Sequence, residues 1–450
     1  SGYFNANRER FLSELKTFLA IPSISALPAH RDDVRAAASW VAAKLSEMGM
    51  QNVKTIEGSA GQHPLVYADW LNEPGKPTLL LYTHFDVQPV DPLNQWTSPP
   101  FQPTERNGKL FGRGTADDKG QGYILLAALE GFFKTAGKLP VNIKVLFEGE
   151  EESSGEHIAE YVQTHAQELG CSAALILDCG MFEPGLPTIS TGLRGLVCAE
   201  LVCRGAARDL HSGEFGGAAP NAVQALAEII AKLKPPTGRI AIPGIYKQVV
   251  RPDKLELDSW AALPFDEQTY CSQHVGAPAL IGDKRYSVLH RTWALPTLEI
   301  NGITGGFSGE GFKTVIPAVA SAKVSMRLVP DMDPHLAAKL LSDYVQKVSP
   351  KHVRTEVKIL SASPAMRVET SNPFIQACAQ AYKLTFGKEP AYVREGGSIP
   401  IAGTFKTVLD VPVLLTGFSL PDCNMHAPDE NLDLANFHAG IQAIGRYFTL

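Results

Sequence analysis

Hydrophobic positions recur along the first part of the chain with two different spacings. A spacing of three to four residues, typical of amphipathic helices, covers residues 3–20 and 31–49, and the segment IPSISALP interrupts it between them. Apolar runs of strand length and one further helical stretch then alternate, at residues 77–87, 120–137, 141–150 and 173–180. Strands that alternate with helices in this way predict an α/β layer with a largely parallel central sheet flanked by helices.

The pattern changes after about residue 190. Residues 195–205 and 318–330 alternate apolar and polar side chains, as half-buried antiparallel strands do, and a helical stretch follows each of them. This repeat predicts a compact α+β domain inserted into the first one. Helical residues 372–387 and strand-like residues 411–418 then return to the α/β layer.

Two domains also agree with the length of the chain, because 450 residues exceed what a single hydrophobic core usually supports. The pattern assigns residues 1–190 and 366–450 to the main domain and residues 191–365 to the insert. Within the insert, the proline-rich residues 235–297 are expected to pack as loops.

Composition excludes several classes of partner. The formal net charge is −6 and there is no basic run, which argues against nucleic acid or an anionic membrane surface. No apolar stretch approaches the ~18 residues of a membrane span. The seven cysteines are scattered and include no CxxC pair, so we expect reduced thiols and a cytoplasmic location.

Polar side chains gather where the apolar runs end. His84 and Asp86 lie two residues apart, so both point to the same face of a strand. Glu150–Glu152 and Asp178 end the next two runs. A buried hydrogen bond or a solvated acidic turn would explain each motif alone. The carboxyl ends of parallel strands, however, meet at one edge of a sheet, which favours a common site.

Two further segments contribute candidates to this site. In GRGTADDKGQG, glycines flank Asp117 and Asp118, and the segment lacks the pattern of a phosphate-binding loop. NMHAPDEN places His426 in a turn-rich loop. Imidazole and carboxylate groups together suit zinc, with manganese as the alternative, and the absence of cysteine ligands favours an open catalytic site. Pooled, these residues indicate a paired-metal hydrolase.

Six segments in order carry a resemblance to a known family: THFDVQP, GRGTADDKG, EGEEESSG, LILD, DLHSGEFGG and NMHAPDEN. They resemble the M20 family of di-zinc peptidases, and most closely its dipeptidase branch, which includes cytosolic nonspecific dipeptidase and carnosinase. The resemblance spans nearly the whole chain. It implies that the main domain is catalytic and that the insert is a lid and dimerisation domain.

The resemblance also implies a role for each residue of the site. It makes Asp86 the carboxylate that orients a metal-bound histidine and Glu151 the general base, with Glu150 outside the metal site. It implies that Asp117 bridges the two metals, that a cis peptide follows it, and that Asp118 occupies a variable position. The implied metal ligands are His84, Asp117, Glu152, Asp178 and His426.

Outside this set, the resemblance assigns four residues to catalysis and substrate binding. The histidine that matches His211 stabilises the oxyanion in the active site of the other subunit, so the resemblance predicts a homodimer formed through the insert. Residues matching Thr314, Arg327 and Ser398 hold the carboxylate end of the substrate. Arginine suits this task because its guanidinium can pair with a carboxylate through two hydrogen bonds.

The implied reaction is hydrolysis of an amide bond in a dipeptide or similar small substrate with a free carboxylate. A hydroxide held between two metals attacks, and Glu151 moves the proton. The ligand set would equally suit an N-acyl-amino-acid deacylase, a desuccinylase or a carboxypeptidase of the same family. A non-catalytic metal-binding homologue that acts as a binding protein is the alternative from a different class.

Overall fold

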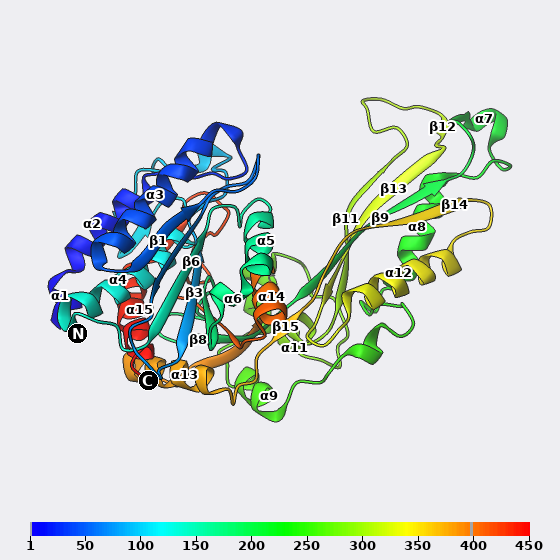
Figure 1. Cartoon of the computed structure of the whole chain (residues 1–450). Helices are drawn as coiled ribbons and strands as arrows, with labels where there is room; N and C mark the ends of the chain where they lie inside the picture. The colour runs from blue at the N-terminus through cyan, green and yellow to red at the C-terminus, as the bar shows by residue number, and fades with distance from the viewer. Residues whose placement is uncertain (1, 397–398) are drawn as a thin grey trace. The chain divides into compact units, whose positions relative to one another are not determined.

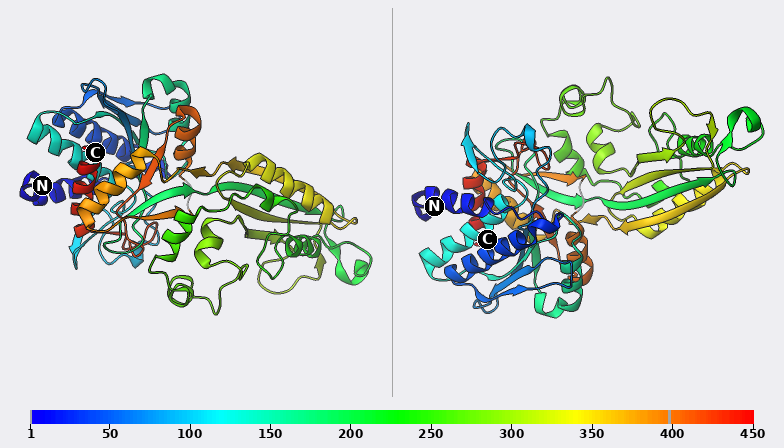
Figure 2. Two further views of the ribbon diagram at one scale, coloured as in Figure 1. Left: turned by 90° about the horizontal axis from the view of Figure 1, so that it is seen from below. Right: turned by 90° about the horizontal axis from the view of Figure 1, so that it is seen from above.

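The computed structural model describes residues 2–396 and 399–450, which form two compact units. Unit 1 comprises Ser1–Thr191, Val368–Val393 and Pro400–Leu450. Unit 2 comprises Gly192–Arg367 and Arg394–Ile399. The chain therefore leaves unit 1 for a long segment, Gly192–Arg367, and again for a short one, Arg394–Ile399. Figure 2 shows both ends of the chain on unit 1.

A mixed sheet forms the centre of unit 1, with the strand order β1-β2-β6-β3-β7-β17-β8, and β16 pairs with β8. Neighbouring strands among β6, β3, β7 and β17 are parallel, and β1 and β2 are antiparallel to their neighbours. The predicted fold class is thus confirmed. The strands are β1 (Gln51–Ile56), β2 (Leu65–Trp70), β3 (Thr78–His84), β6 (Asn142–Glu148), β7 (Ala173–Leu177), β8 (Thr188–Leu193), β16 (Ala391–Glu395) and β17 (Val413–Thr416).

Helices cover both faces of this sheet. Figure 1 shows α2, α3, α4 and α15 along one face and α5, α6 and α14 along the other. The helices of unit 1 are α1 (Gly2–Ala6), α2 (Arg8–Leu19), α3 (Arg31–Met48), α4 (Lys119–Ala136), α5 (Glu156–Thr164), α6 (Ala166–Leu169), α13 (Pro373–Phe386), α14 (Pro400–Thr404) and α15 (Leu434–Tyr447). No helix in the described part of the chain is long and apolar enough to cross a membrane.

The two-sided cover explains why the central strands are continuous apolar runs rather than alternating ones. Every residue of β6 is buried, and so is every residue of β7. A small antiparallel sheet lies elsewhere in unit 1, with the order β18-β5-β4. Its strands are β4 (Thr104–Arg106), β5 (Lys109–Phe111) and β18 (Asn431–Asp433).

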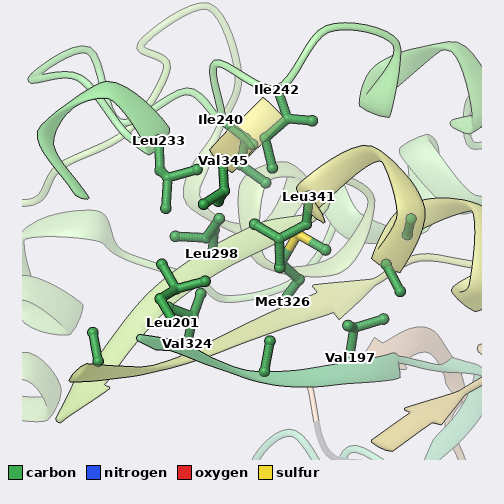
Figure 3. Close-up of a cluster of buried hydrophobic side chains, with 14 of the residues drawn as sticks. Val197, Leu201, Leu233, Ile240, Ile242, Leu298, Val324, Met326, Leu341 and Val345 are labelled. Carbon is green, nitrogen blue, oxygen red and sulfur yellow. The ribbon is translucent and has the colours of Figure 1, made fainter. Parts of the chain in front are cut away.

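Unit 2 contains a four-stranded antiparallel sheet with the order β11-β13-β9-β14. The strands are β9 (Gly195–Arg204), β11 (Thr297–Gly305), β13 (Val319–Leu328) and β14 (Arg354–Ser363). Helices α8 (Ala222–Leu233) and α12 (Pro334–Val348) pack on it, and Figure 3 shows the apolar side chains between them, including Leu201, Val324 and Leu341. A short two-stranded sheet pairs β10 (Leu210–His211) with β12 (Val315–Ile316), and α7 (Ser212–Phe215) follows β10. β15 (Met366–Arg367) pairs with the end of β8.

The expectation that residues 235–297 are loops is wrong in part, because this stretch contains short helices. They are a 3-10 helical turn (Ile245–Gln248), α9 (Lys254–Ala261), α10 (Glu267–Thr269), a π-helical turn (Tyr270–Val275) and α11 (Val288–Trp293). At the start of α9, Asp253 accepts a hydrogen bond from the amide of Glu256, and the Glu256 side chain accepts one from the amide of Asp253. This reciprocal cap stabilises the start of a short helix within a proline-rich stretch.

Candidate metal centre

The candidate site lies in unit 1, where the carboxyl ends of adjacent parallel strands meet. β3 ends at His84, the turn after β6 carries Glu150–Glu152, and Asp178 follows the last residue of β7. Asp117 and Asp118 precede α4, and His426 lies in the loop between β17 and β18. Buried strands thus deliver His84, the glutamate turn and Asp178 to the edge of the sheet, where parallel α/β folds place their sites, and two loops add Asp117, Asp118 and His426.

Two groups of possible metal ligands are present at this edge. His84, Asp118 and Asp178 form one group, and Asp117, Glu152 and His426 form the other. Within each group, the ligand atoms lie within 4.8 Å of one another. Asp117 links the groups, because its Oδ1 is 3.1 Å from Nε2 of His84 and its Oδ2 is 2.8 Å from Nε2 of His426.

Asp86 holds His84 and the glutamate turn together from one side. Nδ1 of His84 is 3.1 Å from the carbonyl oxygen of Asp86 and 3.3 Å from its Oδ1. The backbone amides of Glu151 and Glu152 donate to the two carboxylate oxygens at 3.2 and 3.0 Å, and Ser25 Oγ donates to Oδ2 at 2.6 Å. With Nδ1 directed to Asp86, Nε2 of His84 is left for a ligand.

The three consecutive glutamates face different surroundings. Glu150 turns away from the site, and its carboxylate accepts hydrogen bonds from the backbone amides of His63 and His157. Glu152 turns toward the site, with Oε1 3.1 Å from Nε2 of His426 and Oε2 accepting a hydrogen bond from Gln88 at 2.7 Å. The glutamate run is therefore not a solvated acidic face.

The pair Asp117–Asp118 is joined by a cis peptide bond. Asp117 reaches both histidines, whereas Asp118 Oδ2 accepts hydrogen bonds from Thr83 Oγ1 and, at 3.4 Å, from the backbone amide of His84. The other oxygen, Asp118 Oδ1, is buried and has no hydrogen-bond partner among the described residues. A Cβ atom at Gly120 would lie 1.9 Å from the carbonyl oxygen of Thr115, so this turn requires glycine there.

Electrostatic shifts in the centre reflect a surplus of buried carboxylates. Burial and the charge of Asp118 raise the pKa of Asp178 well above its ordinary value. Burial, with added repulsion from Glu152, raises the pKa of Glu151 to about 7. Hydrogen bonds to Asp117 and Glu152 raise the pKa of His426 to about 10. Burial disfavours charge on Asp117, but its bonds to the two histidines outweigh this effect and lower its pKa.

These observations fit divalent metal ions. Carboxylates that must hold protons when buried together are stabilised as anions by a nearby cation. The donor atoms are imidazole nitrogens and carboxylate oxygens, the set that zinc and manganese share. Oδ1 of Asp118, which has no hydrogen-bond partner among the described residues, is a further acceptor that a cation would satisfy.

Four contributors to this architecture were not predicted from the sequence. Ser25 lies in the segment IPSISALP, which sequence analysis treats only as a helix breaker. Glu430, in NMHAPDEN, is fully buried and pairs with buried Arg113 at 2.7 Å. Gln88 follows the strand that carries His84. Their signal in the sequence is a polar residue close to a motif, which is too common to single them out.

His211, Thr314 and Arg327, which are candidates for oxyanion and substrate binding, lie in unit 2. His211 and Thr314 are neighbours, because β10 pairs with β12 and the amide of Ser212 donates to the Thr314 carbonyl oxygen at 3.1 Å. Both side chains are exposed. Arg327 is half-buried on β13, where it pairs in register with Leu196. Ser398 lies outside the described residues.

Known proteins are similar to this chain along nearly its whole length. The Cys-Gly metallodipeptidase dug1 of Schizosaccharomyces pombe is 33% identical over 454 residues, which cover 98% of this chain and 95% of that protein. The Beta-Ala-His dipeptidase of Homo sapiens is 29% identical, with 99% of this chain and 91% of that protein covered. The crystal structure of the M20 family metallo-carboxypeptidase Sso-CP2 from Sulfolobus solfataricus superimposes with a TM-score of 0.85 at 29% identity, covering 98% of each chain.

The match to a protein family includes the residues of the metal centre. Residues 80–449 match the family described as "Peptidase family M20/M25/M40", a range that begins just before His84 and ends after His426. Five of the six motifs that resemble this family contain residues of the candidate centre, and the sixth, DLHSGEFGG, lies in unit 2. By its sequence and by its fold, this chain belongs to peptidase family M20/M25/M40.

Proposed function

We propose that this protein is a metal-dependent dipeptidase that hydrolyses the amide bond of small substrates with a free carboxylate. The observation that carries the proposal is the position of Asp117, whose two carboxylate oxygens each contact the histidine of a different ligand group. A shared carboxylate between two groups of this composition is the arrangement that a two-metal hydrolase needs. The names of the similar proteins support a dipeptide substrate.

In this proposal, one histidine and one terminal carboxylate would hold each metal, and Asp117 would contribute to both sites. His84 and Asp178 would hold the first metal, and His426 and Glu152 the second. Zinc suits these donors, and manganese is the alternative. When bound, the ions supply Lewis acidity, which lowers the pKa of water and polarises a carbonyl group. Asp86 and Gln88 would keep two of the ligands, His84 and Glu152, in their orientations.

Glu151 is the proposed general base. Its backbone is fixed by Asp86, and its neighbour Glu152 faces His426, so the side chain of Glu151 is the glutamate left for proton transfer. A pKa of about 7 in the absence of metal already lies near the range in which a carboxylate exchanges protons at neutral pH. The group takes a proton from the attacking water and delivers it to the leaving amine.

The proposed roles in unit 2 concern the substrate and the partner subunit. His211 would stabilise the oxyanion in the active site of a second copy, which makes the functional protein a homodimer. Thr314 and Arg327, with Ser398, would hold the carboxylate end of the substrate. All seven cysteines are free, which supports a cytoplasmic location.

A carboxypeptidase is the second candidate, favoured by the structural similarity to Sso-CP2 along the whole chain. Both activities need a free carboxylate at the end of the substrate. They differ in whether the site also requires a free α-amine, because a dipeptide carries one within reach of the scissile bond. The metal ligands are common to both and do not distinguish them.

The deciding experiment compares the hydrolysis of a simple dipeptide with that of the same dipeptide after N-acetylation, on metal-reconstituted protein. A chelator-treated sample is the control. We expect the free dipeptide to be cleaved faster and the chelated sample to be inactive. Faster cleavage of the acetylated compound would instead assign the protein to the carboxypeptidase or deacylase activities.

A further inference from the structure

Glu430 is a charged residue without solvent contact, located four positions after His426. Its exposed fraction is 0%, and it directly precedes β18. The loop that carries it is closed on itself, because Asn431 Nδ2 donates to the carbonyl oxygens of Asp422 and Asp429. His426 and Glu430 therefore belong to one small, internally bonded loop.

The carboxylate of Glu430 accepts four hydrogen bonds, two on each oxygen. Oε1 accepts from the backbone amides of Ala116 at 2.8 Å and Asp117 at 3.1 Å. Oε2 accepts from the backbone amide of Gly114 at 3.0 Å and from Arg113 Nη1 at 2.7 Å. Three of the four donors are thus consecutive or nearly consecutive amides of the turn that presents Asp117.

The ion pair with Arg113 does not by itself explain why the carboxylate of Glu430 is buried. Burying a charged pair costs as much free energy as the attraction returns, so such a pair is weak support for stability. Arg113 also has other partners, because Nη2 donates to the carbonyl oxygen of Pro89 at 3.0 Å and the guanidinium lies over the ring of Trp96. The contacts specific to Glu430 are those with the backbone of residues 114–117.

Asp117 is consequently held twice by the same loop. Its side chain contacts His426, and its backbone amide donates to Glu430. We propose that Glu430 is a positioning residue that fixes the turn carrying Asp117 and thereby controls the affinity of both metal sites together. This inference rests on the proposed role of Asp117 as the ligand that the two sites share.

The test measures zinc binding to the metal-free protein by titration calorimetry and does not depend on turnover. Glu430→Gln keeps the size of the side chain but replaces one acceptor oxygen with an NH₂ donor that faces amide donors. We expect the affinity of both sites to fall together, by about 10–100-fold. His84→Ala and His426→Ala serve as references, each weakening one site more than the other.

Arg113→Lys is the matched control. It retains the positive charge beside Glu430 and all three backbone hydrogen bonds, so we expect wild-type affinity at both sites. The inference would be overturned if the metal-free Glu430→Gln variant unfolds more easily than wild type but binds two zinc ions with wild-type affinity. Glu430 would then be a purely structural residue. The inference would also be overturned if Glu430→Gln lost zinc affinity only at the site that contains His426. A loss of zinc affinity at both sites in Arg113→Lys would overturn it too.

The outcome for the proposed function is separate. Wild-type protein that binds two metals but cleaves no amide would remove the dipeptidase proposal, while the effect of Glu430→Gln on metal affinity would still be measurable. Cobalt-loaded protein gives a second readout, because its visible absorption reports the geometry of each site. A changed spectrum in Glu430→Gln, with an unchanged one in Arg113→Lys, is the expected result.

Discussion

The candidate residues of unit 1 and those of unit 2 are held in very different ways. In unit 1, Asp86 and Glu430 are buried and each accepts several hydrogen bonds, so folding itself fixes the positions of the candidate metal ligands. In unit 2, His211 and Thr314 are exposed at a sheet only two residues long in each strand. If the proposed roles are correct, the groups that carry the chemistry are preorganised, whereas those that bind substrate gain their contacts only from the substrate or from a second chain.

Glu151→Gln removes the proposed general base of the unit 1 centre and should reduce turnover more than any other proposed substitution. The amide retains the shape of the carboxylate and leaves Asp86 bound to the same backbone, so both metals should remain. We expect turnover to fall by at least about 10²–10⁴-fold, the usual contribution of a general base. Metal content and the rate of dipeptide hydrolysis check this together. Substantial activity with both metals present would refute the role of Glu151.

His211→Ala tests the proposed role of an exposed residue of unit 2. We expect kcat to fall by about 10²–10³-fold, the usual loss for one oxyanion donor, with metal content and thermal stability unchanged. His352→Ala, an exposed loop histidine of the same unit, is the control and should behave as wild type. Mixing inactive His211→Ala with inactive Glu151→Gln should restore part of the activity if the histidine acts across a dimer. An inactive mixture would contradict the trans arrangement.

The pH dependence of stability sharpens the account of unit 1. Without metal, burial raises the pKa of Glu151 in the folded protein to about 7, compared with its ordinary value of 4.5, which applies to the unfolded chain. Between pH 4.5 and about 7, the folded state therefore keeps a proton that the unfolded state has lost. The unfolding free energy of chelated protein should therefore decrease as pH rises from about 4.5 to 7. At about 1.4 kcal/mol per pH unit, this group contributes about 3 kcal/mol. Denaturant unfolding of Glu151→Gln should show a correspondingly flatter profile, and an equally steep one would contradict this assignment.

Ser25→Ala should have the smallest effect, because Asp86 retains its two bonds to the glutamate turn. We expect metal affinity to fall by about 10-fold, the lower end for a residue that supports a ligand indirectly. Ser23→Ala is the matched control, since Ser23 Oγ donates to the Phe85 carbonyl oxygen instead of to Asp86. Stability should fall in the control without a change in zinc affinity. Equal zinc affinity in both variants would show that Ser25 supports only the fold.

Sequence patterns predicted the parallel sheet because β3, β6 and β7 are continuous apolar runs, and they predicted that His84 and Asp178 lie near each other because parallel strands share an edge. They did not predict that Glu150 turns away from the site, which only the family resemblance implied. They did not predict the role of Glu430 because its partners are backbone amides distant in sequence. Nearly every residue has a backbone amide, so the residue types do not reveal which amides donate to Glu430. They missed α9 because a reciprocal cap of only two side chains starts it within a proline-rich stretch.

The order of residues in the centre has a consequence for biosynthesis. His84, Asp117 and Asp178 are made first, and the ribosome then produces the whole of Gly192–Arg367 before the chain returns to unit 1. β17, which pairs with both β7 and β8, comes later still, and His426 and Glu430 follow it. A chain that ends before Glu430 therefore lacks the hydrogen bonds of this residue to the turn that carries Asp117, and the second group of possible metal ligands is complete only after residue 426 has been made.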